Sequence, residues 1–144
     1  MKRRFQGLAS TAHDDAEVPD GVFLVRVDHA RYSNERQKPC YRLRFLVLEP
    51  EVLAGCSFSS RICCTPRALW RLAWFLRDFG YDPELLARDE VEEKHVIGLR
   101  GVVKISHLVV DGRSLTNLDA FASADAWESI SSAARAPLRP EVAS

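Results

Sequence analysis

Residues 40–48, CYRLRFLVL, alternate between two sets of side chains, a period of two that fits a strand and not a helix. One set is apolar and comprises Tyr41, Leu43, Phe45 and Val47. The other set comprises Cys40, Arg42, Arg44, Leu46 and Leu48. Such alternation predicts a strand with one face on a core and the other face toward solvent. Two arginines, two residues apart, are therefore expected on the solvent face.

Two neighbouring segments show the same period. From Val22 onward, Phe23, Val25 and Val27 share one face, and Leu24, Arg26 and Asp28 share the other. Over residues 56–64, Phe58 and Ile62 alternate with Ser57, Ser59, Arg61 and Cys63. Residues 30–39 lie between the first two strands, and their polar composition predicts a loop.

The period changes to that of a helix after residue 64. Thr65 is a good N-cap residue, Pro66 suits the first helical position, and Gly80 is a stop signal. Between them runs an apolar stripe at helical spacing, made of Leu69, Leu72, Ala73, Leu76 and Phe79. A second, acidic helix is predicted over residues 83–95.

The last part of the pattern is a hairpin. Leu99, Val103 and Ile105 are expected to face inward, and Arg100, Lys104 and Ser106 outward. The Asp-Gly pair in VDGR, residues 110–113, predicts a tight turn, followed by a partner strand over residues 114–121. A short helix is expected around Trp127.

The predicted order is therefore strand, strand, strand, helix, strand, strand. This is the order of the five-stranded OB barrel, whose open face on its second and third strands binds oligonucleotides or oligosaccharides. We expect a mainly β protein of the α+β class with an OB-like barrel, and a generic α+β sandwich is the alternative. The expected division is a flexible N-terminal arm over residues 1–18, an OB-fold domain over 19–122, and a short helix with a disordered tail over 123–144.

Composition fits an ordinary globular protein, with 144 residues, 47% apolar and 28% charged. No apolar run approaches the ~20 residues that span a bilayer, and no apolar segment follows the basic start MKRRF. We therefore expect a cytoplasmic protein without a membrane partner. The four cysteines form no CxxC pair, which favours a reducing compartment. A zinc site that combines them with His29 or His107 is the alternative, although Cys63 and Cys64 should point to opposite faces of a strand.

The net charge is zero, but the charges are unevenly distributed. Residues 22–77 carry ten basic and four acidic side chains, a net charge of +6. Residues 78–95 carry seven acidic and two basic side chains, a net charge of −5. A basic half of this kind indicates an anionic partner, which the neutral total would conceal.

The arginines on the three predicted strands form the candidate binding surface. Arg26, Arg42, Arg44 and Arg61 have outward parity on neighbouring strands, so they should repel one another unless an anion lies across them. The predicted loop adds Arg31, Arg36 and Lys38, and the far hairpin adds Lys104, His107 and Arg113. Single strands are held by a basic groove plus stacking rings, for which Tyr32 is the first candidate and Tyr41 the second. The alternative is that each arginine is simply solvated or paired.

The predicted helix offers a different surface. Trp70, Arg71 and Trp74 lie near the edge of its stripe. Buried tryptophans would complete the core, whereas exposed ones would indicate an interface with a protein partner or a second copy. No catalytic motif is present, and DEVEE at residues 89–93 fits a solvated acidic face better than a metal site. We expect no enzymatic activity, no metal and no cofactor; an enzyme acting on a small substrate is the least favoured hypothesis.

Several scaffold residues also match a known group of proteins. They are Pro19 and Gly21 before the first strand, Gly55 before the third, Thr65, Ala68 and Leu69 at the helix start, Ile97, Gly98 and Gly101 at the fourth strand, and Asp111, Gly112 and Asn117 in the hairpin. On these positions the chain resembles small OB-fold proteins of phages and mobile elements of the single-stranded DNA-binding type. The resemblance covers about 100 residues and concerns the scaffold rather than a chemical signature.

This resemblance implies binding of single-stranded DNA with low sequence specificity, in replication, recombination or repair, and RNA is the alternative ligand. The end of the chain, PLRPEVAS, departs from the acidic tail with a terminal aromatic residue that bacterial single-strand-binding proteins carry. Recruitment of replication enzymes through such a tail is therefore not expected. An OB-like adaptor that uses Trp70 and Trp74 remains the second functional hypothesis.

Overall fold

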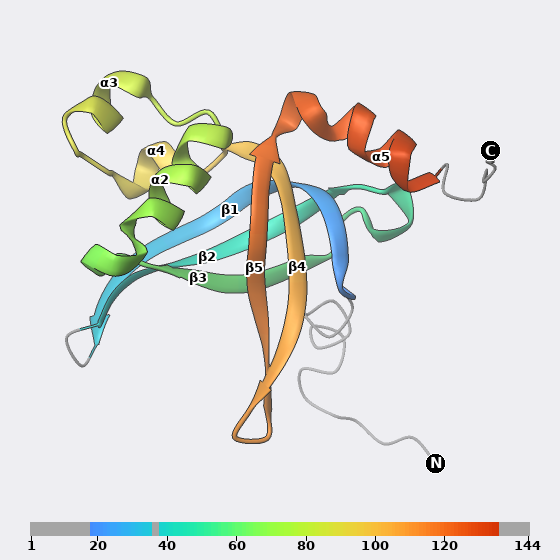
Figure 1. Cartoon of the computed structure of the whole chain (residues 1–144), viewed down its shortest axis with the longest axis horizontal. Helices are drawn as coiled ribbons and strands as arrows, with labels where there is room; N and C mark the ends of the chain where they lie inside the picture. The colour runs from blue at the N-terminus through green and yellow to red at the C-terminus, as the bar shows by residue number, and fades with distance from the viewer. Residues whose placement is uncertain (1–17, 36–37, 136–144) are drawn as a thin grey trace, which may run out of the picture.

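The alternating segments form five antiparallel strands in the computed structural model, which describes residues 18–35 and 38–135 (Figure 1). The strands are β1 (Gly21–Glu35), β2 (Lys38–Glu49), β3 (Ser57–Cys63), β4 (Arg100–Val110) and β5 (Arg113–Ser123). The helices are α2 (Leu69–Asp78), α3 (Pro83–Ala87), α4 (Glu93–Val96) and α5 (Trp127–Arg135). Short 3₁₀ turns cover Glu51–Leu53, Pro66–Ala68 and Ala124–Ala126.

The strands hydrogen-bond in the order β3-β2-β1-β4-β5, so β1 is central. The element order and the mainly β, α+β class predicted from the sequence are confirmed. The two edge strands, β3 and β5, approach each other: the Ser60 hydroxyl of β3 donates a hydrogen bond to the Thr116 carbonyl of β5 at 2.7 Å. Within the described part of the chain no hydrogen-bonded ladder joins β3 to β5, so the strands form one open sheet. The predicted closure into a barrel is not confirmed.

The main core lies between the inner face of the sheet and α2. Its centre is aromatic: the ring centroids of Phe45 and Phe58 are 5.2 Å apart, and those of Phe75 and Phe79 are 4.6 Å apart. Of the residues predicted to face inward on β1 and β2, six are buried, namely Phe23, Val25, Val27, Leu43, Phe45 and Val47. Tyr41 is partly buried against the core.

The predicted helix stripe needs one correction. Leu69 is 48% exposed, and Phe75, which the predicted stripe did not include, is buried instead. The reason is local: residues 66–68 form a 3₁₀ turn, so the α-helix begins only at Leu69 and docks through Leu72, Phe75 and Leu76. Thr65 precedes the turn but its side chain makes no capping hydrogen bond.

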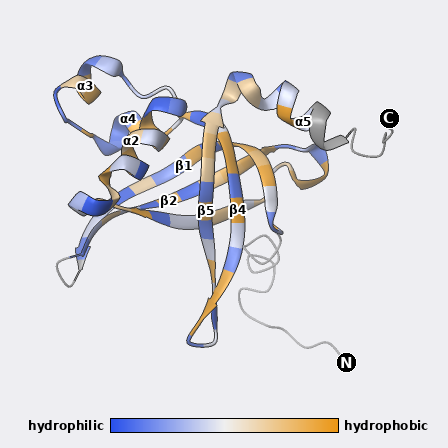
Figure 2. Ribbon diagram, viewed as in Figure 1, coloured by the Kyte–Doolittle hydropathy of each residue, from blue (hydrophilic) through white to orange (hydrophobic). Residues whose placement is uncertain are grey.

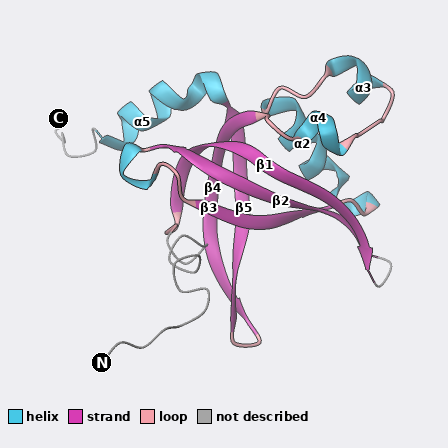
Figure 3. Cartoon of the chain, turned by 180° about the vertical axis from the view of Figure 1, so that it is seen from behind, coloured by secondary structure: helices cyan, strands magenta, loops and turns pink. Residues whose placement is uncertain are grey.

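A second apolar cluster lies on the outer face of the sheet, under α5. Leu24 and Val102 are buried there against Trp127, and the Trp127 indole donates to Glu49 at 2.9 Å. Seen from behind, α5 lies at one end of the sheet and α2, α3 and α4 lie at the other (Figure 3). The outward apolar residues of β1 and β4 are therefore explained by a helix that covers them.

The loop predicted over residues 30–39 is wrong for the residues that the structure describes there, and the helix predicted over residues 83–95 is interrupted. Residues 30–35 extend β1, and β2 begins at Lys38, so the first hairpin is longer than expected. The acidic segment breaks into α3 and α4, because Asp89 adopts a positive φ of 59° that interrupts the helix.

The boundaries of the fold also differ from the prediction. Val18, assigned to the flexible arm, is 1% exposed and belongs to the core. The helix predicted around Trp127 is confirmed as α5. The rest of the predicted arm and the predicted tail beyond residue 135 lie outside the described residues.

The β4–β5 hairpin projects away from the core, and its hydrophobic colouring continues into the projecting end (Figure 2). Val109 is 76% exposed, and Leu108, Val110 and Leu115 are each nearly half exposed.

No helix in the described ranges is long and apolar enough to cross a membrane.

Gly101 on β4 generates a testable prediction about this core. A Cβ there would collide with the Phe79 ring, because the backbone of β4 passes directly against it. We expect Gly101→Ala to lower the free energy of unfolding by about 1–3 kcal/mol, as overpacking does. Chemical denaturation measures it. If the collision is the cause, Phe79→Leu combined with Gly101→Ala costs less than the sum of the two single changes, and strict additivity would contradict it.

Candidate nucleic-acid interface

A β-bulge in β1 decides which side chains reach the outer face of the sheet. The register with β2 shifts between Val27 and His29, so Asp28 is an extra residue. In an unbroken strand Arg26 and Arg31 would point to opposite faces, since their separation is odd. The bulge restores the parity of Arg31, and Ala30 becomes the inward residue, 5% exposed. Arg26 and Arg31 thus share the outer face with the arginines of β2 and β3.

We call this surface the arginine face. It consists of the exposed outward residues Arg26, Arg31, Arg42, Arg44, Arg61 and Arg100.

Three of these arginines stand in one row across three strands. Arg42 is the register partner of Arg31 on one side and of Arg61 on the other. Arg31 was predicted in a loop, so the structure brings it closer to the other arginines than the sequence indicated.

The pair Arg42 and Arg61 belongs to the narrow type of antiparallel pair. Narrow and wide pairs alternate along a ladder, and hydrogen bonds from Val47 to Cys56 and from Cys64 to Pro39 identify both ends of the β2–β3 ladder as wide, hydrogen-bonded pairs. Counting inward, the Arg42 and Arg61 pair is narrow, with its Cα atoms about 4.5 Å apart. The two arginine side chains therefore leave the sheet on the same face from closely spaced Cα atoms.

The next row contains His29, Arg44 and Ser59. It lines an open hollow of about 500 Å³ together with Asp28, Arg42 and Leu43. Arg44 donates to the Ser57 hydroxyl at 3.1 Å, and its Nε lies 4.0 Å from the Asp28 carboxylate. Among the described residues, Asp28 is the one acidic residue that lines the hollow. Its carboxylate and Arg44 are both about half exposed, so this ion pair is weak.

Arg26 faces a further arginine that the sequence reasoning did not include in the site. Arg100 is its register partner on β4, and both are exposed. Its outward parity was visible in the sequence, and the missing information was that β4 pairs with β1.

The two predicted stacking rings lie on the opposite face. Tyr32 pairs with Tyr41, at a centroid distance of 5.4 Å and edge to face, on the inner side of the sheet beyond Leu43. The Tyr32 backbone N–H donates to the carboxylate of Glu93, the first residue of α4. No Phe, Tyr or Trp has outward parity in the paired segments of β1, β2 and β3. The arginine face therefore lacks the stacking partner that was predicted for it.

Burial raises the pKa of Tyr41 from 10.0 to about 12, with smaller contributions from Cys64, Glu93 and its other neighbours. Its phenol is consequently held in the neutral form.

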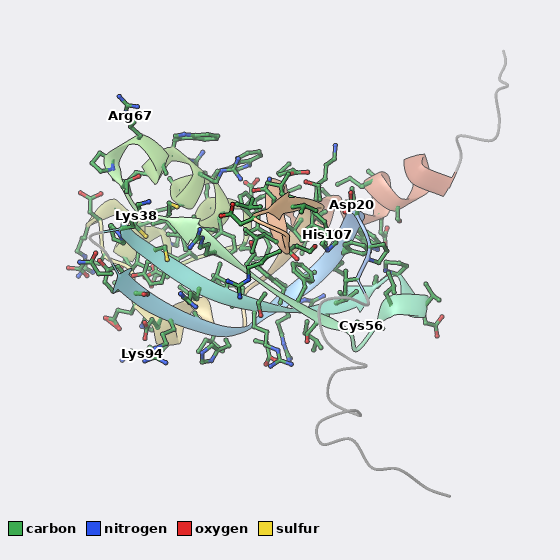
Figure 4. The ribbon with its side chains drawn as sticks, turned by 90° about the horizontal axis from the view of Figure 1, so that it is seen from below. Asp20, Lys38, Cys56, Arg67, Lys94 and His107 are labelled. Carbon is green, nitrogen blue, oxygen red and sulfur yellow. The ribbon has the colours of Figure 1, made fainter. Side chains whose placement is uncertain are left out.

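The remaining predicted contacts are dispersed. Lys38 is exposed, shares the parity of Arg42 and lies at the hairpin end of the sheet (Figure 4), and Arg36 lies outside the described residues. Lys104 points outward, but the Leu24 and Val102 patch under α5 separates it from Arg26. Arg113 is at the turn of the projecting hairpin, and His107 is paired with Asp20, as Figure 4 shows.

The helix residues form a separate cluster. Trp70 is 60% exposed and stacks on Trp74, with ring centroids 6.1 Å apart. Trp74 is fixed by an edge-on contact with Phe121 at 5.3 Å and by donation to Asp78 at 2.9 Å. Arg71 lies 5.5 Å from the Trp70 ring and donates to the Leu118 carbonyl, so it joins α2 to β5. Only Trp70 of this trio offers a broad free surface.

The cysteines do not gather with the histidines named for a zinc site. Cys56 lies before β3 and Cys63 at its far end, and all four thiols are free. In the part of the chain that the structure describes, no three His, Cys, Asp or Glu side chains are grouped to hold a metal ion.

Comparison with known proteins found no matching family model and no similar curated protein.

The raised pKa of Tyr41 generates a prediction about alkaline stability. Because the folded pKa of about 12 exceeds the ordinary 10.0, the folded state retains a proton that the unfolded state loses. This contribution is complete below pH 10 and is lost as the pH rises toward 12. We expect Tyr41→Phe to reduce the alkaline fall in the free energy of unfolding, measured by urea denaturation. Tyr32→Phe is the matched control, and an equal effect of both changes would argue against burial as the cause.

Proposed function

We propose that the protein binds single-stranded nucleic acid, with single-stranded DNA as the principal ligand, through phosphate contacts on the arginine face. It acts without catalysis and with little base specificity. The resemblance of the scaffold residues to OB-fold proteins of phages and mobile elements adds the expected setting, which is replication, recombination or repair.

The observation that carries the proposal is the row of Arg31, Arg42 and Arg61. Like charges directly opposite one another destabilise a sheet, and the narrow pair is the closest arrangement available. A polyanion laid across the row would relieve this repulsion and would release counterions from its own phosphates. Arg44, Arg26 and Arg100 extend the same field along the strands.

The mode of binding follows from what the face carries. Arginine forks suit phosphate oxygens, because they donate two parallel hydrogen bonds. Phosphate contacts position a strand but carry no sequence information. With no aromatic ring of outward parity on β1 to β3, charge rather than stacking supplies the affinity. We therefore expect binding that tolerates sequence and weakens steeply with salt.

A second function is favoured by the exposure of Trp70 at 60%. A large ring held rigid by Trp74 and flanked by Arg71 has the composition of an interface centre. On this alternative the protein is an OB-like adaptor whose helix docks on a protein partner or on a second copy. The two functions use different surfaces and can be tested separately.

Binding of a fluorescent oligothymidine at several salt concentrations tests the first function. We expect Arg42→Ala and Arg61→Ala each to weaken binding and to reduce the log–log salt slope by about 0.7, the value for one phosphate on a single strand. Arg77→Ala is the matched control, because Arg77 is an exposed arginine on α2 rather than on the sheet. Asp28→Asn should strengthen binding, since it removes the carboxylate beside Arg44.

No binding at low salt would overturn the proposal, and so would equal losses for Arg42→Ala and Arg77→Ala. A duplex and an RNA of the same length, run in parallel, report the preference among nucleic acids. A duplex bound more tightly than the single strand would contradict the choice of ligand.

The adaptor alternative predicts concentration-dependent mass in light scattering and solvent-exposed tryptophan emission from Trp70. Trp70→Ala should abolish any self-association while leaving oligothymidine binding unchanged. Trp127→Phe is the control for emission, because Trp127, the first residue of α5, is buried against the sheet. A monomer at all concentrations whose emission does not change in Trp70→Ala would count against this surface.

A further inference from the structure

Two thiols face each other at the edge of the arginine face. Cys40 on β2 and Cys63 on β3 are register partners. They have the same parity as Arg42 and Arg61, and they form the row next to that pair.

The geometry of this pair is the one that a cross-strand disulfide needs. The Cys64 N–H donates to the Pro39 carbonyl at 2.8 Å, so residues 39 and 64 are a hydrogen-bonded pair. The neighbouring pair, Cys40 and Cys63, is therefore narrow, with Cα atoms about 4.5 Å apart and side chains closer than in a wide pair. Disulfides span Cα separations of roughly 4.4–6.8 Å and short Cβ separations. The two thiols can be joined without moving the backbone far.

The two thiols differ in access. Cys63 is exposed, whereas Cys40 is buried at 7% exposure. A solution reagent meets Cys63 first, and Cys40 is then the nearest thiol in the same row. This is the arrangement of an attacking and a resolving cysteine.

The other cysteines are poor competitors. Cys64 points to the inner face, where its thiol lies 3.7 Å from the Ile62 carbonyl. Burial and the neighbouring Cys40 and Cys63 raise the pKa of Cys64 to about 11, which keeps it a thiol at neutral pH. Cys56 precedes the opposite end of β3.

We propose that Cys40 and Cys63 form a reversible cross-strand disulfide by exchange with a low-molecular-weight disulfide such as oxidised glutathione. The Cys63 thiolate attacks one sulfur of the reagent, forms a mixed disulfide and releases one thiolate. The Cys40 thiolate then attacks Cys63 Sγ, forms the intramolecular bond and releases the second thiolate. The protein loses two protons and two electrons in total, and the reagent is reduced to two thiols.

The proposal does not depend on nucleic-acid binding. It rests on the register and burial of two residues, and its test uses no oligonucleotide. If it holds, a covalent bond ties β2 to β3 one row away from Arg42 and Arg61, which makes this edge of the arginine face responsive to the thiol balance.

The test is incubation of the full chain in mixtures of reduced and oxidised glutathione, followed by intact mass and peptide mapping. We expect a loss of about 2 Da, which reducing agent reverses, and a crosslink between the peptides that hold Cys40 and Cys63. One tryptic peptide, residues 62–67, contains both Cys63 and Cys64. Cys64→Ser is therefore required to assign the bond, and it should leave crosslinking intact, as should Cys56→Ser.

Single changes of the pair separate the two steps. Cys40→Ser should leave Cys63 as a stable mixed disulfide with one glutathione, and Cys63→Ser should leave Cys40 unmodified while the protein is folded. Cys40→Ala serves in place of Cys40→Ser if the buried hydroxyl prevents folding. A crosslink that Cys64→Ser abolishes, or a wild-type protein that stops at the mixed disulfide, would overturn the proposal.

Discussion

The antiparallel ladder of β1 with both β2 and β4 is the constraint on which the rest of the structure depends. β1 pairs with β4 from Gly21 to Arg26. The next residue, Val27, exchanges backbone hydrogen bonds with Leu99 and Gly98, which precede β4. The bulge at Asp28 follows at once, and β1 then continues with β2 alone. The change from two paired neighbours to one and the change of parity therefore occur at the same place in β1.

The outer face of the sheet is divided by this arrangement. At one end Leu24 and Val102 are covered by Trp127, and the indole is fixed by Glu49. At the other end no described helix covers the row of Arg31, Arg42 and Arg61. The apolar end gains from burial, whereas the other end presents exposed arginines on neighbouring strands. One surface is therefore apolar and covered at one end, and basic and exposed at the other.

The inner face collects the aromatic residues. Phe45, Phe58, Phe75, Phe79 and Phe121 form a connected cluster, and Tyr32 and Tyr41 extend the same side toward α4. This explains why the arginine face is poor in rings: the inward parity that builds the core takes the aromatic residues of β2 and β3. The outer face of these strands therefore presents charge rather than rings, and Trp70 on α2 carries an exposed ring on a different surface.

The local pattern of apolar and polar residues was sufficient to predict the strands, the helix after β3 and the closing hairpin. It also predicted the outward parity of Arg42, Arg44 and Arg61. The reason is that a period of two or of 3.6 can be recognised within a short stretch of sequence. The local pattern failed at Arg31, Tyr32 and Leu69. A bulge reverses the parity of the residues after it, and no residue type in this segment predicts the bulge. A polar segment such as residues 30–35 can also form a strand when a neighbouring strand provides its hydrogen-bond partners. The Arg26 and Arg100 pair, the cover that α5 gives to Leu24, and the meeting of Cys40 with Cys63 join residues far apart in the chain. Only the tertiary fold could decide those contacts, since they depend on which strands become neighbours and in which register.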